Sequence, residues 1–271
     1  MSVKKDASGR RYIEVEVEVP GTPEEVWDAI ATGPGVSSWF VPTEEGEGGT
    51  VVSHFGPGMD VVATRTAWEP PRRFAGEGGG FGPGAPPLAA EWTVEARAGG
   101  TCVVRLVHSL FASGDDWDNQ LESIESGWPS FFRTLRLHLT HFRGQRGSGI
   151  HLVSMVPGPE SKVWDALTRS LGLTDIARGQ KFKTPAGLAP LEGVIEEVGN
   201  GKHPHQIHVS LQEPTPGIAH FFVHAECGPV FVENRFYFYG PQAGAAVQRD
   251  EPLWQSWLTE NFSPPGEAAK V

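Results

Sequence analysis

Two histidines in the first half of the chain, His54 and His108, lie among apolar residues in segments that alternate like β-strands. An imidazole titrates near neutral pH, so either ring could orient a hydroxyl or carbonyl group of a ligand, or act as a general acid or base. Arg65 and Arg105 lie on similar segments and could bind a ligand carboxylate. We favour the alternative for all four, which is a hydrogen-bonded structural role for the histidines and a solvent-facing position for the arginines. No catalytic residue is therefore predicted.

Aromatic and apolar side chains of the first half could line a pocket near these histidines. A concave, mostly aromatic site with a few polar groups suits a small apolar molecule. The alternative is that these side chains simply fill a core, as regularly spaced aromatic residues usually do. We predict a cavity. The predicted ligand-binding residues are Trp39, Phe40, His54, Phe55, Met59, Trp68, Trp92, Leu106, His108, Trp128, Phe132 and Leu135.

The second half of the chain is rich in histidine. Imidazole side chains suit zinc or copper, but no cysteine or carboxylate completes a tight ligand spacing around these residues. The sequence also has no G-x-S-x-G motif and no phosphate-binding loop. We therefore expect no metal and no cofactor, and interpret the histidines as a coincidental surface cluster. They are His203, His205, His208, His220 and His224.

The composition limits the partners of this chain of 271 residues. A formal net charge of -11 disfavours nucleic acid and anionic membrane surfaces. No stretch approaches the roughly 18 apolar residues of a membrane-spanning helix, and the first residues lack the apolar run of a signal peptide. The two cysteines form no CxxC motif and are expected to be reduced. The sequence thus predicts a cytoplasmic protein with no nucleic-acid partner and no membrane insertion.

One segment of the chain occurs twice. The residues from Val19 to Ile30 return, 137 positions later and without a gap, as the residues from Val156 to Leu167, and both copies contain a Trp-Asp pair. A period of this length is too long for a solenoid repeat and fits a whole domain. The repeat predicts two related domains in tandem.

The first copy reads as a strand, a helix, several strands and a long helix. Alternating valine and glutamate predict a strand over residues 13–19, and Thr22-Pro23-Glu24-Glu25 is a capping box that begins a helix. Strand patterns separated by turns fill residues 50–110, and the Gly/Pro-rich residues 78–87 must form a loop. Apolar residues at spacings of three and four predict a long helix over residues 118–142. The second copy repeats this order and ends in a short helix at about residues 253–262.

This order of elements is typical of an α+β layer structure and resembles the helix-grip fold of START-like and birch-pollen-allergen-like domains. Residues 10–145 resemble in particular the domain of the heat-shock-90 ATPase activator homologues. The resemblance implies a curved antiparallel sheet that grips the long helix, with a cavity between them. The matching stretches are Ile13–Ile30, Trp39–Pro42, Gly48–Thr50, Trp68–Phe74, Val104–Ser109, and Gly127-Trp128 ahead of Phe132 and Leu135.

We therefore predict two tandem helix-grip domains, at residues 10–145 and 150–262. The first is expected to bind a small apolar molecule without catalysis, with the loop at residues 78–87 gating entry. Two alternatives remain, which the resemblance suggests: a polyketide-type cyclase or dehydratase, and a co-chaperone-like interaction module. Because its closing helix is short, the second domain is expected to be structural or to mediate a homodimer.

Overall fold

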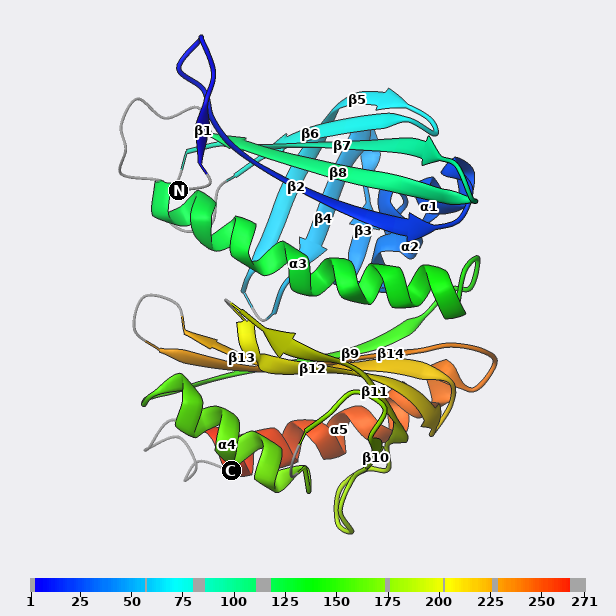
Figure 1. The fold of residues 1–271 in the computed structure, drawn as a ribbon, viewed down its shortest axis with the longest axis vertical. Helices are drawn as coiled ribbons and strands as arrows, with labels where there is room; N and C mark the ends of the chain where they lie inside the picture. The colour runs from blue at the N-terminus through cyan, green and yellow to red at the C-terminus, as the bar shows by residue number, and fades with distance from the viewer. Residues whose placement is uncertain are drawn as a thin grey trace. The chain divides into compact units, whose positions relative to one another are not determined.

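The computed structural model describes residues 3–56, 58–79, 86–110, 118–173, 176–201, 203–225 and 229–263. The chain divides into two compact units, Met1–Gln145 and Arg146–Val271. Each unit contains one antiparallel sheet and helices that cover one of its faces (Figure 1). This confirms the predicted α+β class.

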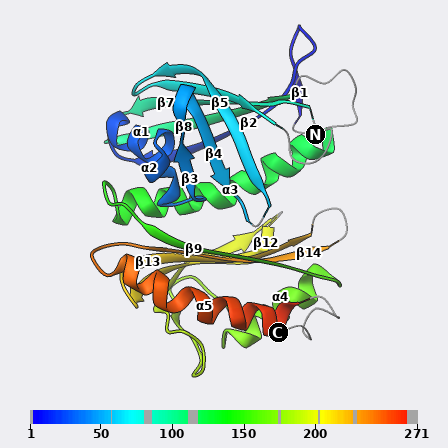
Figure 2. The same cartoon turned by 180° about the vertical axis from the view of Figure 1, so that it is seen from behind.

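The first unit follows the predicted order of strand, helix, strands and long helix. In the sheet the strands are ordered β1-β2-β8-β7-β6-β5-β4-β3, so the long β2 pairs with β8, the last strand before the closing helix. Figures 1 and 2 show this sheet curling over α3. The elements are β1 Lys4–Lys5, β2 Arg11–Pro20, α1 Pro23–Ala31, α2 Gly33–Ser37, β3 Thr43–Glu45, the 3-10 turn η1 Glu47–Gly49, β4 Thr50–His54, β5 Asp60–Glu69, β6 Arg73–Gly78, β7 Leu88–Arg97, β8 Thr101–Leu110 and α3 Asp118–His141.

The helix α1 begins at the predicted capping box. The Thr22 hydroxyl accepts a hydrogen bond from the backbone N–H of Glu25, and the Glu25 carboxylate accepts one from the backbone N–H of Thr22. Two amide groups that the first turn leaves unpaired are thereby satisfied. Val26 and Ile30 then lie buried in the core.

We expect Thr22→Ala to lower the free energy of unfolding by about 1 kcal/mol, because the variant loses the hydroxyl that caps α1. Thr22→Ser keeps this hydroxyl and should stay close to the original protein. Urea unfolding of the three proteins measures both effects. Equal stability of the alanine and serine variants would show that the cap contributes nothing.

The two faces of the first sheet differ in chemistry. Ile13 and Val19 on β2 are buried on the face that meets α3, whereas the glutamates between them lie on the opposite face. There Arg105 of β8 hydrogen-bonds through Nε to Glu14 at 2.7 Å and lies 3.4 Å from Glu16. The period-two alternation of β2 therefore separates a core face from a solvent face.

The second unit repeats the first with fewer strands. Its strand order, β10-β11-β12-β13-β14-β9, again pairs the opening strand with the last strand before the closing helix. Ile13 faces His108 across β2 and β8, and Ile150, 137 positions later, faces Phe236 across β9 and β14. The tandem architecture is confirmed. The elements are β9 Ser148–Val156, α4 Glu160–Ser170, β10 Lys181–Lys183, β11 Glu192–Asn200, β12 His203–Glu213, β13 Gly217–Ala225, β14 Val230–Phe238 and α5 Ala243–Phe262.

The expectation of a short closing helix in the second unit is wrong. The helix α5 has 20 residues and continues through Pro252. Its first half buries Ala243 and Ala246 rather than large apolar side chains, so it lacks the hydrophobic signal of an amphipathic helix. The second unit thus has a closing helix long enough to cover its sheet.

In the described part of the chain, no helix is long and apolar enough to cross a membrane.

Candidate ligand-binding site

Trp128 lies at the centre of an aromatic cluster between the first sheet and α3. Its ring centroid is 5.2 Å from those of Phe40 and Trp92, and 5.4 Å from that of Phe132. His108 stacks on the same ring at 5.7 Å, with an interplanar angle of 25°. The helix α3, the strands β7 and β8 and the segment after α2 therefore meet at one point.

His108 is the polar member of this cluster. Its side chain extends from β8 beside Ile13 and Ala90, the partners on either neighbouring strand, and only 8% of the residue is exposed. Neither ring nitrogen has a hydrogen-bond partner among the described residues. Burial lowers the pKa of His108 to about 4. The ring is therefore neutral near pH 7, with one N–H donor and one acceptor nitrogen.

A buried polar group without a partner is rare in folded proteins and calls for an explanation. The N–H of His108 could donate a hydrogen bond to a hydroxyl or carbonyl oxygen of a bound molecule, and its other ring nitrogen could accept one from a hydroxyl group. The surrounding rings would contact the apolar part of such a molecule. This arrangement has the chemistry of a site for a small, uncharged and mostly apolar ligand.

The cluster extends toward α1 through further rings. Phe74 stacks on Trp92 at 5.9 Å and contacts Trp27 at 5.4 Å. Trp27 in turn lies 4.9 Å from Trp68, which is 42% exposed and has the Arg65 guanidinium 4.0 Å above its ring. One end of the aromatic layer is thus open to solvent.

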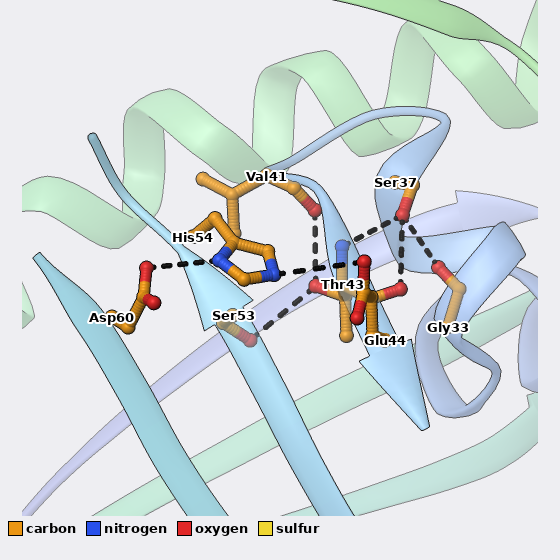
Figure 3. Close-up of polar contacts among 8 residues, drawn as sticks. All are labelled: Gly33, Ser37, Val41, Thr43, Glu44, Ser53, His54 and Asp60. Atoms are coloured by element: carbon orange, nitrogen blue, oxygen red, sulfur yellow. Dashed lines mark hydrogen bonds and ion pairs between the residues drawn. The ribbon is translucent and has the colours of Figure 1, made fainter. Parts of the chain in front are cut away.

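His54 lies apart from this layer. Figure 3 shows its ring between two carboxylates, with Nδ1 2.8 Å from Asp60 and Nε2 4.0 Å from Glu44. Beside it, the backbone N–H of Thr43 donates to the Ser37 hydroxyl at 2.9 Å, which fixes α2 against β3. The His54 side chain is 34% exposed. These are polar contacts at the surface, where they join the ends of β3, β4 and β5.

The structure brings most of the predicted ligand-binding residues together. Trp39, Phe40, Leu106, Trp128, Phe132 and Leu135 belong to one buried cluster, and Phe55 and Trp92 pack against it. Trp68 joins through other rings, whereas His54 and Met59, which is 44% exposed, lie outside. Arg105 occupies the solvent face, and Arg65 hydrogen-bonds to the carbonyl oxygen of Ala31 and pairs with Glu45.

Three rings of the aromatic layer are absent from the predicted set, and the first of them is Trp27 of α1, which lies 5.4 Å from Phe74. Phe74 faces Trp92 directly across β6 and β7, and Phe131 lies 4.8 Å from Phe40. The spacing of three residues between Trp128 and Phe131 carried a signal for Phe131. The pairing of Phe74 with Trp92 depends on the register between β6 and β7, which local sequence patterns do not predict.

The histidines of the second half are dispersed over several contacts. His205 bonds to Glu160 at 2.6 Å, and His224 bonds to Glu233 at 2.9 Å. His208 and His220 are completely buried and stack on each other at 3.9 Å across β12 and β13, so the expectation of a surface cluster is wrong for these two. Among the described residues no group of three or more possible metal ligands comes together.

Residues 80–85 of the loop that was expected to gate the site lie outside the described residues.

Residues 10–134 match the model of a protein family described as "Polyketide cyclase / dehydrase and lipid transport". The match covers most of the first unit and less than half of the chain. Together with the topology, it confirms the predicted START-like helix-grip fold, which the chain contains as two tandem copies. No curated protein matches the chain.

Several solved structures resemble the chain distantly. DynU16 from the dynemicin biosynthetic locus is 17% identical, over 91% of this chain and 94% of its own, with a TM-score of 0.43. The di-domain ARO/CYC BexL from the BE-7585A biosynthetic pathway is 15% identical over 93% of each chain, with a TM-score of 0.45. The Aha1 dimer from Colwellia psychrerythraea is 20% identical over 49% of this chain and 98% of its own, with a TM-score of 0.40.

Proposed function

We propose that the first unit binds a small, mostly apolar molecule between its sheet and α3, without transforming it. The observation that supports this most strongly is His108, a buried imidazole without a hydrogen-bond partner among the described residues, stacked on Trp128. The family description, which includes lipid transport, is consistent with a carrier or sensor of an apolar compound.

The low pKa of His108 favours binding over catalysis. A ring with a pKa of about 4 is a weak base at neutral pH, so it is better suited to hydrogen-bonding a ligand than to taking a proton from it. Its neutral form can donate to a carbonyl oxygen or accept from a hydroxyl group. The ligand class that fits is therefore an uncharged aromatic or alicyclic molecule with at least one oxygen.

The phenol 2-naphthol is a suitable probe, and the indole N–H resonance of Trp128, assigned with Trp128→Phe, is the reporter. We expect 2-naphthol to shift this resonance in the full chain labelled with nitrogen-15. His108→Leu should weaken the apparent affinity about tenfold, the worth of about one hydrogen bond. The affinity should be constant from pH 5.5 to 8, because His108 stays neutral throughout this range.

His54→Leu is the matched control, because it removes a histidine of the same unit that is paired on the surface. It should leave the affinity unchanged. The proposal fails if 2-naphthol does not shift the Trp128 resonance, or if the two leucine variants bind alike. Thermal unfolding of both variants confirms that they are folded.

A cyclase or dehydratase is the second candidate function, because the matched family is also described by these activities. In that case His108 would move a proton of a polyketide-like substrate, and His108→Leu would abolish turnover while a substrate analogue still bound. Loss of binding without any turnover in the original protein would favour the carrier function.

Native mass spectrometry of the purified protein tests two further parts of the proposal. A small molecule retained by the folded chain and released on unfolding would identify the natural ligand. The same spectrum gives the oligomeric state, and thus tests whether the chain forms a homodimer, for which we propose the second unit as the interface. We propose a cytoplasmic location for this carrier, which fractionation of the source cells would check.

A further inference from the structure

The second unit contains its own buried polar side chain without a partner. Asn234 on β14 is completely buried, and neither its amide nitrogen nor its amide oxygen has a hydrogen-bond partner among the described residues. Its neighbours at alternate positions, Val232 and Phe236, belong to the core of this unit. Since side chains alternate along a strand, Asn234 points to the same interior.

A second unpartnered group lies in the same interior. Trp254 on α5 is 1% exposed, and its indole N–H has no acceptor among the described residues. Its ring lies 4.9 Å from Phe236 and 6.3 Å from Phe221, which is the direct partner of Asn234 across β13 and β14. Asn234 and Trp254 therefore adjoin the same two rings, one from the strand and one from the closing helix.

The tandem repeat shows that this asparagine is not required by the fold. Asn234 faces Leu152 on β9, and the counterpart of Leu152 in the first unit is Val15, 137 positions earlier. Val15 faces Leu106, so Leu106 is the counterpart of Asn234. Leu106 is a fully buried core residue. The second unit thus carries an amide where the first has an apolar side chain, while Phe236 occupies the position of His108. The interior polar group has moved by one inward-facing position.

We propose that the second unit binds an uncharged, mostly apolar molecule with one hydroxyl group, held by Asn234 and Trp254. A hydroxyl group can accept a hydrogen bond from the indole N–H of Trp254 and donate its own proton to the amide oxygen of Asn234, which gives each of these two atoms a partner. The rings of Phe221, Phe236 and Trp254 contact the apolar part. A charged ligand is disfavoured, because these apolar neighbours offer no counter-charge. This site is independent of the one at His108.

A matched pair of probes, 4-ethylphenol and ethylbenzene, tests the role of the hydroxyl group. The full chain, labelled with nitrogen-15, is titrated with each, and the indole N–H resonance of Trp254, assigned with Trp254→Phe, is followed. We expect 4-ethylphenol to shift this resonance and to bind about tenfold more tightly than ethylbenzene. Both titrations are repeated in His108→Leu, which impairs only the first site. The response of the Trp254 resonance should be unchanged in this variant, so a failure of the first site is distinguished from a failure of the second.

Asn234→Leu places in the second unit the residue that the first unit has at this position, and should therefore fold. We expect this variant to lose the preference for 4-ethylphenol, with ethylbenzene binding unchanged. The proposal is overturned if 4-ethylphenol does not move the Trp254 resonance, which would assign Asn234 to a buried water. It is also overturned if the original protein binds both probes equally, or if Asn234→Leu keeps the preference for the phenol.

Discussion

Arg235→Met is expected to lower the free energy of unfolding by about 3–5 kcal/mol, the typical cost of removing one partner of a buried ion pair. Arg235 lies on β14 and donates to the carboxylate of Glu233, at 2.6 Å from Nη2 and 3.1 Å from Nε. The two side chains are only 5% and 10% exposed. Methionine keeps much of the volume but leaves the carboxylate buried without its cation.

The pH dependence of this loss identifies its cause. Burial by itself would raise the pKa of Glu233, but the Arg235 charge and the hydrogen bonds from His224 and Arg235 lower that pKa to about 2. The pair therefore stabilises the fold above about pH 4.5, the ordinary value, and this contribution is lost as the pH falls toward 2. In Arg235→Met burial prevails, and Glu233 takes up a proton more readily.

Urea unfolding between pH 7 and 3 should thus show the largest difference in the free energy of unfolding between Arg235→Met and the original protein at neutral pH. This difference should narrow below about pH 4.5. Arg105→Met is the matched control, because Arg105 also pairs with a glutamate on a strand but is 47% exposed. Its loss should cost less than about 1 kcal/mol. A gap of constant size over the whole pH range would contradict an electrostatic origin.

Trp39→Ala is expected to destabilise the first unit by about 3–5 kcal/mol, as removal of a large buried aromatic side chain does. Trp39 is 1% exposed, its indole N–H donates to the backbone carbonyl of Ala29 at 2.9 Å, and its ring stacks on Phe40 at 5.5 Å. The substitution leaves a cavity and an unpaired carbonyl between α1 and the aromatic cluster. The role of Trp39 is therefore chiefly to pack the wall of the site.

Trp68→Ala provides the comparison, because Trp68 belongs to the same aromatic layer but is 42% exposed. Its loss should cost about 1 kcal/mol. Trp39→Phe, which keeps an aromatic ring but lacks the N–H donor, should fall between the two. Urea unfolding ranks the three variants, and near-ultraviolet circular dichroism reports whether the core remains packed. A smaller effect of Trp39→Ala than of Trp68→Ala would contradict the packing role.

Local sequence patterns determined the elements that open each unit and the helix that closes the first. The alternation in β2, the capping box of α1 and the apolar stripe of α3 each depend on residues within a few positions of one another. These signals need no tertiary information. The same reasoning underestimated α5, since its first half packs through Ala243 and Ala246, whose small side chains give no periodic signal.

The candidate sites depended on register between distant strands. The sequence placed His54 and His108 on equal terms, as histidines among apolar strand residues. Only the pairing of β8 with β2 and β7 puts His108 against Trp128, while the end of β4 places His54 between Asp60 and Glu44.

The repeated segment by itself determined that the chain contains two related units and which strand and helix open each, whereas the helix-grip fold was implied by the resemblance of the first half to a known family. The tertiary structure alone decided which buried polar groups lack a hydrogen-bond partner among the described residues, as His108 does in the first unit and as Asn234 and Trp254 do in the second. The physical reason is that hydrogen-bond satisfaction is set by neighbours on other strands and on the closing helix. Those neighbours are fixed by sheet register and helix packing, which join residues far apart in the chain.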